Sequence, residues 1–132
     1  MPKNPYYDLI LEHFPDFTYK TGKKFAYHPP KTVVIGPSEP HSELLLLHEV
    51  SHAILKHKAF KTDVERLRIE SSAWDKAKTL AFSLKIPFSD DFAQSRLDSY
   101  RDWLHSRSLC KKCHLTRFQT EDGKYHCPLC DA

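Results

Sequence analysis

Glycine and long hydrophobic runs are both scarce in this sequence. Only three of its 132 residues are glycine, against nine prolines, which excludes a collagen-like or glycine-rich low-complexity chain. The longest uninterrupted apolar stretch, Leu44–Leu47, is far shorter than the ~20 residues of a membrane-spanning helix. No apolar segment follows the opening Met-Pro-Lys-Asn-Pro, as a signal peptide would require. We therefore expect a soluble, cytoplasmic protein without a membrane partner.

A strong excess of charge of one sign is also lacking. Lys and Arg number 20, Asp and Glu number 17, and the formal net charge is +3. Such a mild excess does not by itself indicate a nucleic acid or a membrane surface as partner. With 40% hydrophobic residues, the chain is long enough for one domain with a real core and a small appendage.

Cysteine is absent from the first 109 residues and concentrated in the last 23. The four cysteines form two C-x-x-C pairs, Cys110–Cys113 and Cys127–Cys130, separated by thirteen residues that include the hairpin dipeptide Asp122-Gly123. Two such pairs supply the four thiolates that a structural zinc ion prefers. This spacing favours a C-terminal zinc ribbon over residues 108–132, rather than a redox dithiol pair or free cysteines. Residues 1–107 then form the main domain.

The rest of the chain is mostly helical in its patterning. Helices are expected over 4–14, 42–58, 63–86 and 89–107, with Ser42 as an N-cap and Pro15 and Pro87 as stops. Short strands are expected over 24–27 and 32–35. The predicted fold class is α+β, with a dominant helical core, a small β-sheet and the four-cysteine ribbon.

The helix over 42–58 contains His48-Glu49-Val-Ser-His52, an H-E-x-x-H motif. Residues four apart lie about 40° apart on one face of a helix, so both imidazoles can bind one metal ion. Glu49 lies about 100° round from His48, where it can hold a water molecule without binding the metal itself. The alternative is a pair of ordinary, partly buried histidines.

The next helix offers a third ligand, Glu70. This residue lies in the middle of an apolar stripe, where a carboxylate is costly unless it is paired or bound to a metal. Glu65 and Asp75 point away from that stripe, and Asp63 is better explained as the helix N-cap. The stripe is made of Leu67, Trp74, Ala77, Ala81 and Leu84.

The spacing of the two helices agrees with this assignment. A turn centred near Lys61 makes them an antiparallel pair, and His52 and Glu70 are equally far from that turn along the sequence. His57 is half a turn from His48 on a continuous helix and so lies off the ligand face. Two histidines and one glutamate, with one position left for water, are typical of a catalytic zinc site. We therefore expect two Zn²⁺ ions per chain, one catalytic and one structural.

These motifs resemble those of the gluzincin metallopeptidases. His48–His57 followed by Glu70-Ser-Ser-Ala-Trp-Asp-Lys-Ala77 is similar to H-E-x-x-H with a downstream E-x-x-A-[DNW], and most similar to the short ImmA/IrrE-type peptidases and minigluzincins. The resemblance covers roughly residues 30–87. It implies that His48, His52 and Glu70 bind zinc and that Glu49 is the general base. Many gluzincins place an Asp four residues after the third ligand, where this chain has Trp74.

The activity that follows is hydrolysis of peptide bonds in a cytosolic protein or peptide substrate. The exposed edge of the strand over 32–35 is expected to bind the substrate as an added strand. An oxyanion-stabilising side chain is expected from one of three residues, Tyr27, Tyr100 or His105.

Two other functions are compatible with the same motifs. SprT-like proteases of DNA-associated proteins also combine H-E-x-x-H, a ligand-bearing helix and a zinc ribbon, but they use a third His where this chain has Glu70. From Arg107 to Ala132 there are five basic and three acidic residues, so four thiolates and one Zn²⁺ bring the ribbon to zero net charge, which disfavours DNA binding. The other alternative is a non-catalytic adaptor in which both zinc ions only stabilise the fold.

Overall fold

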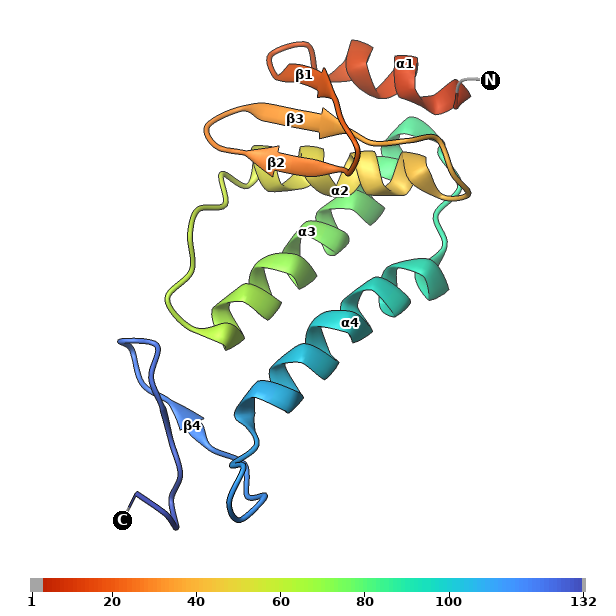
Figure 1. Cartoon of the computed structure of the whole chain (residues 1–132). Coiled ribbons are helices and arrows are strands. Elements are labelled where there is room, and N and C mark those ends of the chain that lie inside the picture. The colour runs from red at the N-terminus through yellow and green to blue at the C-terminus, as the bar shows by residue number, and fades with distance from the viewer. Residues whose placement is uncertain (1–3, 132) are drawn as a thin grey trace.

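The computed structural model describes residues 4–131 and shows an α+β fold, as predicted (Figure 1). The first three residues and the last residue of the two expected domains lie outside the described part. The helices are α1 (Pro5–His13), α2 (Ser42–Ile54), α3 (Asp63–Leu84) and α4 (Asp90–Ser108). The strands are β1 (Thr18–Thr21), β2 (Ala26–His28), β3 (Thr32–Ile35), β4 (Phe118–Gln119) and β5 (Tyr125–His126).

The three-stranded sheet has the order β1-β3-β2. Strand β3 has the predicted bounds, but it is the central strand: β1 pairs with it in parallel and β2 pairs with it antiparallel. The expectation that residues 32–35 present a free edge is therefore wrong. Strand β1, with the largely polar sequence Thr-Tyr-Lys-Thr, was not predicted. The two outer strands of this sheet are β1 and β2.

Helix α2 differs from its prediction at both ends. It ends at Ile54 rather than near residue 58, because the chain turns through a left-handed conformation at Lys56. The N-cap is His41, also left-handed, so the prediction of Ser42 as N-cap is wrong. The Ser42 hydroxyl lies inside the first turn and accepts a hydrogen bond from the Glu39 backbone N–H at 3.2 Å.

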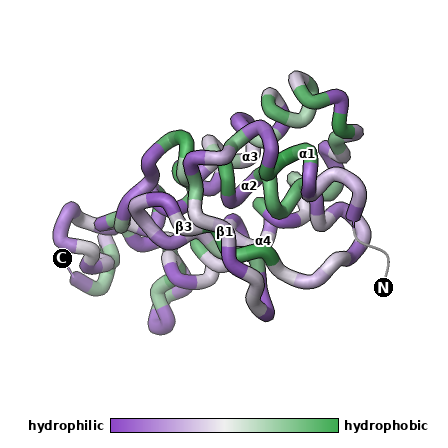
Figure 2. Tube along the Cα trace, turned by 90° about the horizontal axis from the view of Figure 1, so that it is seen from above, coloured by the Kyte–Doolittle hydropathy of each residue, from purple (hydrophilic) through white to green (hydrophobic). Residues whose placement is uncertain are grey.

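Helix α2 lies at the centre of the main domain. Figure 1 shows the sheet on one side of it and α3 on the other, with α4 packed alongside α3. Leu44, Leu46, Leu47 and Val50 are buried in the same hydrophobic core as Ala77 and Ala81 of α3, whose small side chains allow the two helices to approach closely. Figure 2 shows the hydrophobic segments gathered where α1, α2 and α3 lie together. Among residues 4–131, no helix is both long and apolar enough to cross a membrane.

The C-terminal cysteines lie on a small hairpin. Strands β4 and β5 pair antiparallel, with Phe118 opposite His126, as the Asp122-Gly123 dipeptide predicts. Gly123 has φ of +85°, a left-handed conformation that glycine adopts without steric cost. The hairpin brings the two C-x-x-C pairs together at the end of α4.

Candidate metal centres

Helix α2 brings the two histidines of the H-E-x-x-H motif together, as their spacing predicts. The Nε2 atoms of His48 and His52 are 3.1 Å apart, and each residue is only 6% exposed. Burial lowers the pKa of His48, and the interaction with Glu70 only partly opposes that effect. The Nε2 atoms of both rings thus face the same point, where one metal ion could contact both.

Helix α3 delivers Glu70 to this point. Its Oε2 atom lies 2.8 Å from His48 Nε2 and 3.3 Å from His52 Nε2. Burial alone would raise the pKa of Glu70, but the hydrogen bonds and charges of the two histidines outweigh it and hold the pKa well below its usual value. A tetrahedral zinc ion with bonds of about 2.0–2.1 Å places its ligands about 3.3 Å apart. The His52–Glu70 separation of 3.3 Å equals this value, the two histidine nitrogens are slightly closer at 3.1 Å, and the His48–Glu70 separation is shorter at 2.8 Å.

Glu49 lies beside this triangle, at a greater distance. Its Oε1 atom is 3.8 Å from His48 Nε2, a full ångström farther than Glu70 Oε2. The His48–Glu49–His52 cluster is nevertheless tight enough for all three residues to share an ion. Burial raises the pKa of Glu49 to about 7. A carboxylate with a pKa near neutrality can both take up and release a proton.

Aromatic rings hold the two histidines in place. The ring of Trp74 stacks on His48, with centroids 4.4 Å apart, and the ring of Tyr27 lies parallel to His52 at 6.2 Å. His48 Nδ1 has no hydrogen-bond partner within residues 4–131. Packing against an indole therefore replaces a hydrogen bond as the means of orienting His48.

His57 orients the other histidine. Its Nδ1 atom is 2.8 Å from His52 Nδ1, on the side of the ring opposite the Nε2 atom that faces His48 and Glu70. The helical-wheel argument that placed His57 away from the site is wrong, because α2 ends at Ile54 and the chain folds back. Residues beyond a helix end do not follow its periodicity, so the sequence contained no signal for this contact. His57 does not reach the triangle formed by the side-chain atoms of His48, His52 and Glu70, and it contacts this triangle through the His52 ring.

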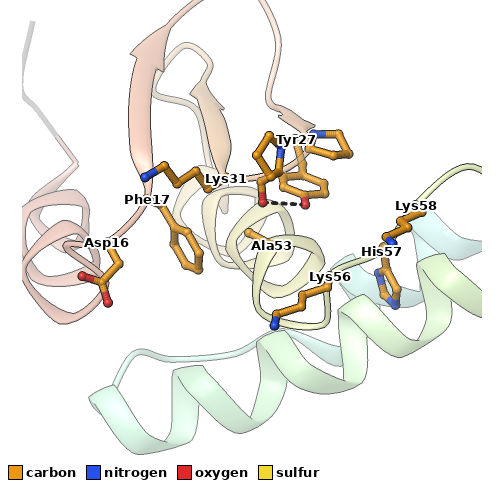
Figure 3. A pocket seen from close by; sticks show the side chains of 10 residues that line it. Asp16, Phe17, Tyr27, Lys31, Ala53, Lys56, His57 and Lys58 are labelled. Atoms are coloured by element: carbon orange, nitrogen blue, oxygen red, sulfur yellow. Dashed lines mark hydrogen bonds between the residues drawn. The ribbon is translucent and has the colours of Figure 1, made fainter.

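The site opens into a groove made of three adjoining cavities. The central cavity, of about 470 Å³, contains Glu49, His52 and Glu70. It shares Tyr27 and His57 with a cavity of about 580 Å³ that we call the lysine cavity (Figure 3). On the other side it shares Glu49 and Tyr100 with a far cavity of about 460 Å³. The groove therefore follows β2 and its flanking residues, with the ligand triangle in the middle.

Of the three side chains proposed to stabilise an oxyanion, Tyr100 is placed best. It lines both cavities that contain Glu49. The hydroxyl of Tyr27 donates a hydrogen bond to the Pro30 carbonyl, 3.1 Å away, and so is already engaged. His105 lies near the C-terminal end of α4 and lines none of the three cavities. Of these residues, Tyr100 has the most direct access to a group bound beside Glu49.

The second cluster consists of the four cysteines near the C-terminus. Their Sγ atoms all lie within 4.8 Å of one another, with Cys110–Cys130 at 3.8 Å and Cys113–Cys127 at 3.5 Å. A tetrahedral site with Zn–S bonds of about 2.3 Å requires S–S separations of about 3.8 Å. Hydrogen bonds from the backbone of Cys113 and Lys112 lower the pKa of the Cys110 thiol to about 6. The four sulfurs are unbridged and arranged for a single ion.

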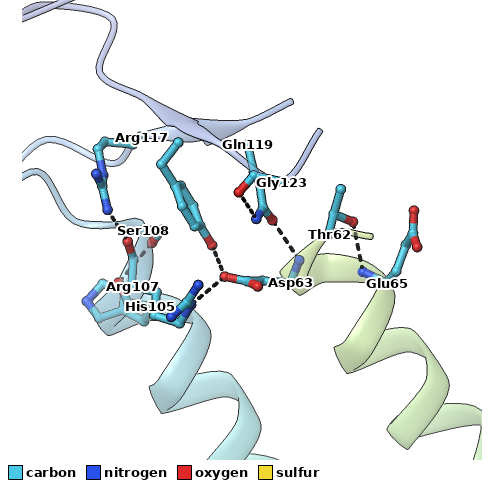
Figure 4. Close-up of polar contacts among 10 residues, drawn as sticks. Thr62, Asp63, Glu65, His105, Arg107, Ser108, Arg117, Gln119 and Gly123 are labelled. Atoms are coloured by element: carbon cyan, nitrogen blue, oxygen red, sulfur yellow. Dashed lines mark hydrogen bonds and ion pairs between the residues drawn. The ribbon is translucent and has the colours of Figure 1, made fainter. Parts of the chain in front are cut away.

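Asp63 joins the cysteine hairpin to the main domain (Figure 4). The expectation that Asp63 is the N-cap of α3 is wrong. Thr62 takes that role, since its side chain accepts a hydrogen bond from the Glu65 N–H. Asp63 is only 4% exposed, and its carboxylate accepts hydrogen bonds from Arg107 Nε at 2.7 Å and from the Tyr125 hydroxyl. Its backbone N–H donates to Gln119 Oε1 at 2.6 Å. A residue at the start of the Glu70 helix thus anchors the hairpin.

We expect Asp63→Asn to lower the free energy of unfolding by about 1–3 kcal/mol, because two donors lose a charged acceptor. Burial raises the pKa of Asp63, but the bonds from Tyr125 and Arg107 outweigh it and hold the pKa below 3.8. This stabilisation is therefore present above pH 3.8 and disappears as the pH falls toward the lower pKa of the folded state. Urea titrations of both proteins at pH 7 and pH 3 measure the difference, with the exposed Asp98→Asn as control. Equal losses in the two variants at pH 7 would contradict the anchoring role.

No family model, curated protein or solved structure matches this chain.

Proposed function

We propose that the protein is a zinc-dependent peptidase of the gluzincin type, with a C-terminal zinc ribbon. The observation that carries the proposal is the triangle of His48, His52 and Glu70 with the buried carboxylate of Glu49 beside it. Three ligand atoms at zinc-compatible separations, next to a group with a pKa of about 7, form the donor set of a hydrolytic rather than a structural site.

Each residue of the site has a distinct task in this proposal. Zinc held by His48, His52 and Glu70 would polarise the scissile carbonyl and acidify a water molecule. Glu49 accepts the proton of the attacking water and returns it to the leaving amine, since its carboxylate lies beside the triangle. Tyr100 donates its hydroxyl proton toward the oxygen that becomes negatively charged. His57 and Trp74 hold the two histidine rings in position.

The substrate lies in the groove along β2. Backbone groups on the free edge of β2 are available to pair with an extended peptide, which moves the proposed strand-addition edge from β3 to β2. The cavities on both sides of the site then receive side chains before and after the scissile bond. Binding of a whole segment explains how a small enzyme would select a protein substrate.

The four cysteines would hold the second zinc ion and close the ribbon around it. Hydrogen bonds through Asp63 connect this ribbon to α3, which supports a structural role over an anchor for DNA. Four unbridged thiols also agree with a reducing cytosolic environment. An SprT-like protease is less compatible, because a carboxylate occupies the position of the third histidine.

Elemental analysis of purified protein tests the metal assignment. We expect two zinc ions per chain in the wild type and one in His48→Ala, because the ribbon is independent of α2. The matched control is His13→Ala, which removes an exposed histidine from α1 and should retain both ions. A single zinc ion in the wild type, or no loss in His48→Ala, would contradict the proposal.

A further inference from the structure

The net charge of the protein lies along the groove. The residues that line the three cavities include seven Lys or Arg and four Asp or Glu, the latter counting Glu49 and Glu70. This difference of three equals the formal net charge of the whole chain, +3. The other thirteen basic residues of the sequence are balanced by thirteen acidic ones. A chain that is nearly neutral overall thus has its excess of positive over negative charge where the substrate would bind.

The lysine cavity combines this charge with an apolar interior. Lys31, Lys56 and Lys58 stand at its border, with Asp16 as the one acidic neighbour (Figure 3). Its remaining surface comes mostly from carbon-rich side chains, namely those of Phe17, Tyr27, Pro29, Pro30 and Ala53. A cavity of about 580 Å³ is large enough for a bulky apolar side chain. The three lysine ammonium groups would then lie beside the substrate residues that flank this apolar side chain.

Arginines continue the positive charge past the site. The guanidinium of Arg66, in the central cavity, lies over the rings of Phe60, Tyr100 and Trp103 at 4.6–5.4 Å. Stacking of this kind fixes the side chain in one place and leaves its edge free for a carboxylate. Arg96, with Lys23 and Lys24, lines the far cavity.

We propose that the groove selects acidic polypeptide segments, in which an apolar side chain enters the lysine cavity and neighbouring carboxylates meet the surrounding cations. The inference rests on the proposed function for the assignment of a polypeptide to the groove. Charges lining a concave, partly apolar surface act more strongly than the same charges on a convex one, because solvent screens them less. The groove therefore favours acidic over basic sequences.

A nucleic acid is the other polyanion that such charges attract, and the shape of the groove disfavours it. The lysines surround a single apolar cavity instead of forming a stripe that follows a phosphate backbone. The free edge of β2 offers hydrogen bonds that match a peptide backbone. Single-stranded nucleic acid is accordingly the competing outcome of the test.

The test is equilibrium binding to full-length Glu49→Gln protein, measured by fluorescence anisotropy. The probe is a short fluorescein-labelled peptide with one leucine between glutamates. Controls are the same peptide with lysine for glutamate, the same peptide with alanine for leucine, and an oligothymidylate of equal charge. We expect the acidic leucine peptide to bind about tenfold or more tightly than the lysine peptide, and about tenfold more tightly than the alanine peptide.

On the protein side, the triple change Lys31→Gln, Lys56→Gln and Lys58→Gln should weaken binding of the acidic peptide about tenfold. The matched control changes three exposed lysines outside the groove, Lys20, Lys78 and Lys124, to Gln, with the same loss of net charge, and should change binding by less than about twofold. Equal effects of the two triple changes would overturn the proposal.

The proposal is also overturned if no peptide binds, if acidic and basic peptides bind equally, or if oligothymidylate binds more tightly than the acidic peptide. These outcomes are separate from failure of the proposed function, because binding is measured in a variant without its base. Zinc content of the same samples reports on the metal site. If the protein bound acidic peptides selectively but contained only the ribbon zinc, the proposal for the groove would stand and the proposed peptidase function would be contradicted.

Discussion

Replacing Glu49 by Gln is expected to lower peptide hydrolysis by about 10²–10⁴-fold. The amide keeps the size of the side chain but cannot take a proton from water. Because Glu49 is farther from His48 Nε2 than Glu70 is, 3.8 Å against 2.8 Å, the change should leave both zinc ions bound. Cleavage is measured by mass spectrometry on a library of acidic peptides and on casein, with zinc content determined on the same preparation.

The control for this change is Glu12→Gln, which alters an exposed glutamate on α1 and should retain full activity. Two results would contradict the assignment of Glu49 in different ways. Loss of the second zinc ion in Glu49→Gln would make Glu49 a ligand and favour the non-catalytic adaptor, in which the protein fills every metal position. Retained zinc with unchanged cleavage would place the chemistry elsewhere.

Replacing Glu70 by Gln is expected to weaken zinc binding at the histidine site by at least about a hundredfold. The carboxylate supplies negative charge and the third ligand atom, 2.8 Å and 3.3 Å from the two histidine nitrogens, and a neutral amide supplies much less of both. The ribbon zinc should be unaffected, and the far-ultraviolet circular dichroism should remain that of a folded helical protein. Competition with a zinc-binding dye measures the two affinities separately.

Glu65→Gln is the matched control, since Glu65 is an exposed glutamate in the first turn of the same helix. Its zinc affinity should equal that of the wild type. An unchanged affinity in Glu70→Gln would show that Glu70 is not a ligand. The short distances to His48 and His52 would then reflect an ordinary buried hydrogen-bonded cluster.

Features that depend on local periodicity could be predicted from the amino-acid sequence. Two histidines four residues apart on a helix must share a face, and the structure places their nitrogens 3.1 Å apart. Glu70 was singled out because a carboxylate interrupts the apolar stripe of α3, and the structure places it beside the two histidines. The two C-x-x-C pairs with a hairpin dipeptide between them likewise predicted a cluster of four sulfurs, and these lie within 4.8 Å of one another.

Features that depend on contacts between distant segments could not be predicted, because no local pattern encodes them. The polar strand β1 pairs with β3 and thereby makes β3 the central strand, which no pattern in Thr18–Thr21 predicted. Asp63 anchors the hairpin because it contacts Arg107 and Tyr125, which lie 44 and 62 positions farther along the sequence.

The charged groove also belongs to the tertiary structure. Its basic residues come from the segments around β2 and β3, the end of α2, and helices α3 and α4. Because they are far apart in the sequence, each one resembles an ordinary solvent-exposed charge when the sequence is considered alone. Periodicity is a property of one helix or strand, whereas an electrostatic field sums over all of them. For this reason the residues of the two clusters were predictable one by one, whereas the charged surface around the histidine cluster could not be predicted without the tertiary structure.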